Sequence, residues 1–293
     1  MVPVHHRTAT VRGHRVFYRE AGDPAAPAVV LLHGFPTSSR MFRGLIPALA
    51  RRYRVIAPDM LGFGHSDAPD VEEFDYTFDA LAEVTGELLG ALGVDRYALY
   101  VQDYGAPVGW RLALRHPGAV RAIITQSGNA YEDGFDPGFW APIREFWAAP
   151  GPSTEAGVRG ALALDAIRWQ YLHGVAEPDL VDPDTWTLDH AGVSRPGNDR
   201  VQVRLMRDYA TNPPLYPAVH EYFRTSRVPL LAVWGAGDEI FLPAGALAFA
   251  RDLPDARIRL VAGGGHFLLE THLDVVVDEV VDFLATAPAP APS

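Results

Sequence analysis

Three ionisable side chains, those of Asp103, Asp238 and His266, each follow a short apolar segment and lie near glycine or other small residues. The apolar segments are residues 97–101, 230–234 and 257–261. If these segments are parallel strands of one sheet, the three side chains meet at its carboxyl edge, where ligands bind in open α/β sheets. A carboxylate can attack carbon, a histidine can take a proton from water, and a second carboxylate can orient that histidine. The pattern predicts a catalytic triad in the chain order Asp103, Asp238, His266.

The segment 101–106, with the sequence VQDYGA, has the features of a nucleophile elbow, which is a tight turn between a strand and a helix. Gly105 and Ala106 allow the helix to start close to the strand, so we expect the Asp103 side chain to project above the sheet edge. An unperturbed aspartate has a pKa of about 3.9 and is charged at neutral pH. It therefore needs no base to make it nucleophilic toward an alkyl carbon.

A fourth motif, His33-Gly34-Phe35-Pro36, follows the apolar segment 28–32 and is expected at the same edge of the sheet. The backbone N–H groups of Phe35 and Tyr104 are predicted to form an oxyanion hole, and His33 is predicted to hold this loop in place. Each charged residue alone has a structural explanation, because an aspartate before a helix caps it and loop histidines are commonly hydrogen-bonded. The occurrence of four motifs in one order favours the catalytic interpretation.

Strand-like apolar segments alternate with helical patterns, which indicates a mostly parallel sheet with helical crossovers, an α/β fold. After a hairpin over residues 11–19 that turns at Gly13, the expected strands are 28–32, 54–57, 97–101, 120–125, 230–234 and 257–261. The expected helices are 79–92, 107–115, 243–251 and 274–284. The segment 131–227 holds no convincing strand and is rich in Trp and Pro, so it predicts a helical cap inserted between two sheet strands. The expected division is therefore a core over 1–130 and 228–285, a cap over 131–227 and a disordered tail over 286–293.

The composition excludes several classes of protein. The chain has 293 residues, a formal net charge of −11 and no cysteine, which excludes disulfides, thiolate catalysis and cysteine-ligated zinc. Its 25 Lys and Arg residues form no long basic run, so we expect no nucleic-acid partner. The histidines show no spacing typical of metal ligands, and no metal or other cofactor is expected. Polar residues 1–10 and the lack of an apolar stretch of about 18 residues predict a cytoplasmic protein without signal peptide or membrane span. The oligomeric state is left open.

Residues 10–284 resemble α/β-hydrolases of the epoxide hydrolase and haloalkane dehalogenase group, in particular a bacterial and fungal branch of epoxide hydrolase-like proteins. The motifs that carry the resemblance are HGFPTSS, APDMLGFGHSD, QDYGAPVGWRLA, WGAGDEIF and GGGHF, with WAPIREFW, DPDTWTLD and TNPPLYP in the cap. The resemblance implies an α/β-hydrolase fold and a small apolar substrate, in which Asp103 opens an epoxide or displaces a halide. Water activated by His266, which Asp238 orients, then hydrolyses the ester on Asp103. Val101 departs from the family pattern of a very small residue at this position, and this predicts a tighter elbow.

The resemblance also implies a donor for the leaving group in the cap. Epoxide hydrolases typically use two cap tyrosines, whereas dehalogenases commonly use a Trp beside the nucleophile, where this chain has Tyr104. One tyrosine usually stands directly before an Arg near the end of the cap, and this chain has Phe223 there. Tyr216 lies seven residues earlier, on the same helical face if the helix extends that far with Pro217 in its first turn. Tyr216 is therefore the leading candidate for the donor.

The other candidate donors are the indole N–H groups of Trp147 and Trp186, although packing of the cap explains these aromatic residues equally well. The favoured function is a cofactor-independent epoxide hydrolase that gives a vicinal diol. Haloalkane or haloacid dehalogenation by the same triad is the alternative. A non-catalytic ligand-binding protein of the same fold ranks below both.

Overall fold

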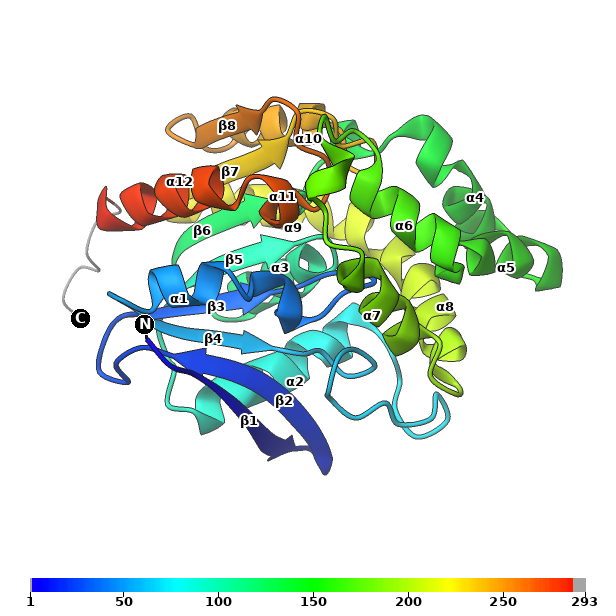
Figure 1. Cartoon of the computed structure of the whole chain (residues 1–293), viewed down its shortest axis with the longest axis horizontal. Helices are drawn as coiled ribbons and strands as arrows, with labels where there is room; N and C mark the ends of the chain where they lie inside the picture. Colours follow the sequence, from blue (N-terminus) through cyan, green and yellow to red (C-terminus); the bar gives the residue numbers. More distant parts are fainter. Residues whose placement is uncertain (1, 287–293) are drawn as a thin grey trace.

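A computed structural model describes residues 2–286 (Figure 1). Within this range eight strands form one sheet in the order β1-β2-β4-β3-β5-β6-β7-β8. The strands are β1 (Val4–Val11), β2 (His14–Ala21), β3 (Ala28–Leu32), β4 (Arg54–Pro58), β5 (Tyr97–Gln102), β6 (Val120–Gln126), β7 (Leu230–Gly235) and β8 (Arg257–Val261). The β1–β2 and β2–β4 pairs are antiparallel and the other pairs are parallel. The prediction of a mostly parallel sheet is confirmed.

The central strands are continuous apolar runs because helices cover both faces of the sheet. Every residue of β5 and of β7 is buried, whereas β8, at one edge, alternates between exposed and half-buried residues over most of its length. The first strand of the hairpin starts at Val4, earlier than expected, because its polar outer residues gave no apolar signal. Arg12 and Gly13 both have positive φ, as a two-residue hairpin turn requires.

Helices flank the sheet on both faces, as expected. In the core they are α1 (Leu45–Leu49), α2 (Phe78–Ala91), α3 (Gly105–Arg115), α10 (Pro243–Ala248), α11 (Leu268–Thr271) and α12 (Leu273–Thr286), with the 3₁₀ helices η1 (Ser39–Phe42) and η6 (Phe249–Arg251). Helix α1 packs on α12, and α2 packs on α3 on the other face (Figure 1). The segment predicted as one helix over 243–251 is α10 followed by η6.

A long helical insertion connects β6 to β7. Its helices are α4 (Pro137–Ala148), α5 (Pro152–Arg159), α6 (Leu164–Leu172), α7 (Asp184–Val193), α8 (Asn198–Asp208) and α9 (Asn212–Ser226), with the 3₁₀ helices η2 (Glu132–Gly134), η3 (Gly160–Leu162), η4 (Pro178–Leu180) and η5 (Tyr209–Thr211). Helices α4 to α8 gather at the end of the sheet toward which the parallel strands point (Figure 1). This places the insertion at the carboxyl edge of the sheet.

The position of Pro217 was predicted wrongly. Helix α9 begins at Asn212, so Pro213 and Pro214 take its first turn and Pro217 lies inside the helix. Arg111 of α3 anchors this helix start, since its guanidinium donates to the side chains of Thr211 at 2.8 Å and Asn212 at 2.7 Å.

At the end of the chain, Thr286 closes α12, and the remainder of the predicted tail, residues 287–293, lies outside the described residues. Among the helices of residues 2–286, none has the length and apolar character needed to cross a membrane.

Val101 is accommodated by two glycines. A Cβ at Gly109 in α3 would lie 2.6 Å from Val101 Cγ1, and a Cβ at Gly128 would lie 3.0 Å from Val101 Cγ2. Val101 itself is fully buried. The larger side chain in β5 therefore fits because its neighbours have no side chains.

We predict that Gly109→Ala lowers the free energy of unfolding by about 1–2 kcal/mol, because the added methyl overpacks this contact. The loss should shrink in a Val101→Ala background, although Leu99 Cδ2 would still lie 2.9 Å from the new methyl. Urea denaturation of the four proteins of this double-mutant cycle measures the coupling. Gly90→Ala in α2, where a methyl meets nothing within 4 Å, is the matched control and should not destabilise. An equal loss in the wild-type and Val101→Ala backgrounds contradicts the prediction.

Candidate active site

Asp103 lies at the tight turn between β5 and α3, with a φ of 48°. Such left-handed backbone is uncommon for a residue with a side chain, and aspartate tolerates it better than most. Two neighbours make room for the turn. A Cβ at Gly34 would overlap the Asp103 side chain, and a Cβ at Gly105 would overlap the Leu32 carbonyl. The local sequence thus fixes the direction in which the Asp103 carboxylate projects.

The structure brings Asp103, Asp238 and His266 together, although they come from three separate loops. His266 Nδ1 lies 3.1 Å from Asp238 Oδ2, and His266 Nε2 lies 4.0 Å from Asp103 Oδ2. Asp103 is 6% exposed, Asp238 1% and His266 2%. The Asp238 Oδ1 accepts the N–H groups of Ile240 and Phe241, which fix the carboxylate in place. Asp238 can therefore hold Nδ1 of the histidine while Nε2 faces Asp103.

One of the two predicted oxyanion donors, the Phe35 N–H, contacts the Asp103 carboxylate directly. The Phe35 N–H donates to Asp103 Oδ1 at 2.6 Å. Burial raises the pKa of Asp103, and the backbone N–H groups of Phe35 and Tyr104 oppose part of this rise. His33 holds the loop that carries Phe35, because its Nε2 accepts the Met60 N–H at 3.0 Å and its Nδ1 lies 3.0 Å from the Gly34 carbonyl. Phe35 thus engages Oδ1 and leaves Oδ2 toward His266.

The two buried charges shift each other's pKa values. Burial raises the pKa of Asp103 to about 6, and His266 and the backbone N–H groups oppose only part of this shift. Burial alone would lower the pKa of His266, but the carboxylates of Asp238 and Asp103 outweigh it and raise the pKa. Asp103 is therefore mostly ionised at neutral pH, as expected, although it is less acidic than a free aspartate.

Gln102 contacts the histidine and was not predicted from the sequence. Its Nε2 lies 3.0 Å from His266 Nε2, and its Oε1 is buried without a hydrogen-bond partner in the described chain. With the Nδ1 proton directed at Asp238, the Gln102 amide donates to the lone pair on Nε2. The only signal in the sequence was its place beside Asp103. Gln102 therefore restrains the histidine ring from the strand side.

A small cavity of about 40 Å³ opens beside Asp103. The core contributes Phe35, Asp103 and Tyr104, and the insertion contributes mostly apolar side chains together with the amide of Gln170 and the phenol of Tyr209. The ring of Tyr209 lies 5.7 Å from that of Tyr104, centroid to centroid. Its hydroxyl is buried and, among residues 2–286, has no hydrogen-bond partner. Tyr209 is thus a phenol that lines the same cavity as the carboxylate, and it is not among the donors predicted from the sequence.

The three cap residues predicted as donors do not line this cavity. Tyr216 is buried behind Tyr209. The two hydroxyls affect each other's pKa, but their geometry falls short of a hydrogen bond. The Trp147 N–H donates to the Met206 carbonyl at 2.8 Å, and Trp186 packs near Tyr171. None of the three predicted donors therefore lies where it could reach a substrate beside Asp103.

Comparisons with known proteins agree with this architecture. Residues 27–166 match the model of a family described as alpha/beta hydrolase fold. The chain is 43% identical over 283 residues to the uncharacterized hydrolase YNR064C of Saccharomyces cerevisiae, and the match covers 96% of this chain and 97% of the yeast protein. The chain belongs to the α/β-hydrolase family.

Solved structures of this hydrolase family are similar over the whole chain. Haloalkane dehalogenase DbeA of Bradyrhizobium elkani is 27% identical with a TM-score of 0.79, and the match covers 97% of this chain and 98% of the dehalogenase. Epoxide hydrolase A of Mycobacterium thermoresistibile is 25% identical with a TM-score of 0.76, with coverage of 98% and 99%. The likeness extends to proteins of both names, so the choice between their reactions depends on the site itself.

We predict that Asp103→Asn raises the free energy of unfolding at pH 7.5 by about 1–2 kcal/mol, because it removes a buried charge. The folded pKa of about 6 lies above the unfolded value of about 3.9, so the folded state binds the extra proton between these pH values. The ionised carboxylate therefore lowers stability above about pH 6, and this penalty disappears below about pH 4.

Urea denaturation of wild type and variant from pH 4.5 to 8 checks the pH dependence. Asp95→Asn, at an exposed residue whose side chain has no hydrogen bond or ion pair within residues 2–286, is the control and should change stability little at any pH. A difference between Asp103→Asn and wild type that grows toward low pH contradicts the assigned burial penalty.

Proposed function

We propose that the protein is an epoxide hydrolase that converts a small apolar epoxide to a vicinal diol, with Asp103 as nucleophile, His266 as base and Asp238 as the residue that orients it. The single observation that carries this choice is the Tyr209 phenol, which shares the small cavity with Asp103 and has an unengaged hydroxyl among the described residues. An epoxide oxygen leaves as an alkoxide and needs a proton donor of this kind.

In the first step Asp103 Oδ2 attacks a ring carbon and the carbon–oxygen bond of the epoxide breaks. The ring oxygen takes the proton of the Tyr209 hydroxyl, which leaves a hydroxyalkyl ester on Asp103 and a phenolate. Oδ2 is the free oxygen, since Oδ1 accepts the Phe35 N–H. The high pKa that burial gives Tyr209 keeps the phenol protonated until the alkoxide forms.

In the second step His266 Nε2 removes a proton from water, and the water oxygen attacks Cγ of the Asp103 ester. The negative charge develops on Oδ1, which already accepts the Phe35 N–H, and the Tyr104 N–H is the second donor of the proposed oxyanion hole. Collapse expels the diol oxygen, which takes the proton held by His266. The new carboxylic acid on Asp103 returns its remaining proton to the Tyr209 phenolate, so one water is consumed for each diol.

Dehalogenation is the second candidate because the chain is similar to a haloalkane dehalogenase. A halide is bound by N–H donors, and two indoles lie near the cavity. The Trp140 N–H donates to the Ile240 carbonyl at 2.7 Å, and the Trp147 N–H donates to the Met206 carbonyl. Both donors are therefore already engaged, which favours the epoxide over the halide.

The proposal assigns the insertion 131–227 as a cap on a core formed by 1–130 and 228–285. Support comes from the cavity beside Asp103. Its wall includes Trp140 from α4, Gln170 from α6 and Tyr209 from η5. The apolar side chains of Ile143 and Met206 complete that wall and suit a small apolar substrate.

We predict that the wild-type protein forms diols from short terminal epoxides and that Asp103→Asn and His266→Gln each lower turnover by at least about a thousandfold. A single turnover in water enriched in oxygen-18, with enzyme in excess, should give unlabelled diol and label in the peptide that contains Asp103. Mass spectrometry of both products measures this. Label in the first-turnover diol means that water attacks the epoxide directly, and halide release from haloalkanes without diol formation assigns the protein to dehalogenation.

We predict that Tyr209→Phe slows formation of the Asp103 ester about a hundredfold, because the leaving oxygen loses its proton donor. Tyr216→Phe removes a buried phenol hydroxyl behind Tyr209, outside the cavity, and should slow ester formation far less. Stopped-flow or quenched single turnovers measure the ester-forming step. A larger effect at Tyr216 than at Tyr209 would restore the donor suggested by the sequence.

A further inference from the structure

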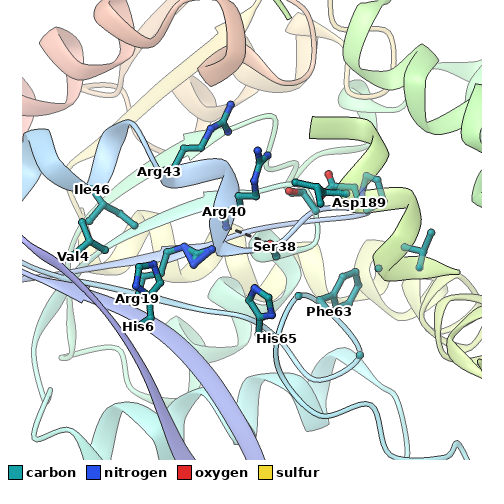
Figure 2. Close-up of a pocket in the computed structure, with 17 residues that line it drawn as sticks. Val4, His6, Arg19, Ser38, Arg40, Arg43, Ile46, Phe63, His65 and Asp189 are labelled. Carbon is teal, nitrogen blue, oxygen red and sulfur yellow. Dashed lines mark hydrogen bonds between the residues drawn. The ribbon is translucent and has the colours of Figure 1, made fainter. Parts of the chain in front are cut away.

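A second cavity, of about 650 Å³, lies between the β1–β2 hairpin, the segment 36–40, the loop 62–65 and α7 (Figure 2). Of the described residues, none lines both this cavity and the small one beside Asp103. The two are separated at neighbouring residues, because Phe35 faces the small cavity and Pro36 the large one. The large cavity is thus a separate concave site near the same sheet edge.

Arg19 is the unusual residue of this cavity. It is 8% exposed, and among residues 2–286 its guanidinium makes no hydrogen bond or ion pair, with Nη1 fully buried. It lies over the ring of Phe17, 5.2 Å from the centroid. Buried charges are normally paired, because an isolated one loses its hydration without compensation. Arg19 therefore has unused hydrogen-bonding capacity directed into a cavity.

The strand register explains how the cation comes to face the cavity. His6 of β1 pairs with Arg19 of β2, so both side chains project from the same face of the hairpin, together with Phe17 two residues earlier. His65 lies on the other side of Phe17, with ring centroids 5.0 Å apart, and is exposed like His6. Figure 2 shows Arg19 and His6 side by side, with His65 nearby. Two imidazoles therefore flank the buried guanidinium.

The acidic groups near the cavity already have other partners. Asp189 lines it and accepts the Tyr171 hydroxyl, and Glu270 is paired with Arg43 at 2.6 Å. Asp59, whose charge reaches Arg19, accepts the N–H groups of Ser39 at 2.8 Å and His65 at 2.7 Å. None of these carboxylates forms a hydrogen bond or an ion pair with Arg19.

We propose that this cavity binds a small organic carboxylate, whose carboxylate group pairs with Arg19 and whose short apolar chain lies against Val4 and Ile46. A guanidinium presents parallel N–H donors that match the two oxygens of a carboxylate. The apolar side chains named here line the same cavity. Arg40 and Arg43 also line this cavity, but Arg40 is only half-buried and Arg43 is paired with Glu270, so Arg19 is the buried cation that the single charge of a carboxylate would pair with. The site is independent of the triad and goes beyond the proposed hydrolysis.

Isothermal titration calorimetry with hexanoate as the probe, at constant ionic strength, tests the site. We expect saturable binding of one hexanoate per chain that Arg19→Met weakens about tenfold or more, because charge-assisted hydrogen bonds are lost. Arg51→Met, at an exposed arginine, is the matched control and should leave binding unchanged. Asp103→Asn should also bind hexanoate as wild type does, which separates this site from the candidate active site.

Wild-type protein alone provides a second readout, so the test does not depend on Arg19→Met being folded. Hexanoate should shift the ring NMR signals of His6 and His65 and leave those of His266 unchanged. Four results overturn the proposal: no saturation, equal binding by Arg19→Met, a shift of His266 instead, or tighter binding of inorganic phosphate than of hexanoate. Hexanoate binding does not depend on diol formation. Failure of the anion-site proposal can therefore be distinguished from failure of the proposed function.

Discussion

The parallel register of β3 and β5 is the constraint on which the site depends. Leu32 pairs with Val101, so the loops after both strands leave the sheet at the same level. Phe35 and Asp103 then meet within hydrogen-bond distance, but only because Gly34 lets the two loops approach and Asp103 takes a positive φ. Such backbone costs about 1–3 kcal/mol and persists where the surroundings enforce it. Here the enforcing contacts are the β3–β5 pairing and the close approach that Gly34 and Gly105 allow.

Burial of the Asp103 carboxylate makes this site costly to stability and suits the proposed chemistry. The Asp103 carboxylate is removed from water, which raises its pKa, while two backbone N–H groups and His266 keep it mostly ionised at neutral pH. A carboxylate poorly hydrated and held by fixed donors is a better nucleophile than one in solvent. Gln102 adds a further restraint, because its Nε2 lies 3.0 Å from His266 Nε2. The fold thus holds the Asp103 carboxylate in surroundings that destabilise its charge, at the residue proposed as the nucleophile.

The sequence predicted the core better than the insertion, for a physical reason. Buried parallel strands are continuous apolar runs, so β3, β5 and β8 were located to within about one residue, and the residues after them meet because parallel strands end at one edge. Helix periodicity, in contrast, does not determine how six helices pack on one another. Tyr209 lies in a short 3₁₀ turn between α8 and α9, where no periodic pattern could point it at Asp103. The hydrogen bond from the Trp147 N–H to a main-chain carbonyl could not be predicted from the sequence either.

The segment 35–40 forms part of the wall that separates the two cavities. Phe35 donates to Asp103 on one side, and Pro36 to Ser38 line the large cavity on the other. Asp59 accepts the Ser39 N–H, and His33 accepts the Met60 N–H, so the segment and the residues before it are tied to the loop that follows β4. Each tie is buried, where a hydrogen bond is expensive to break. An anion at Arg19 therefore meets a wall that is already fixed, and its binding has no means of moving the Phe35 donor away from the carboxylate.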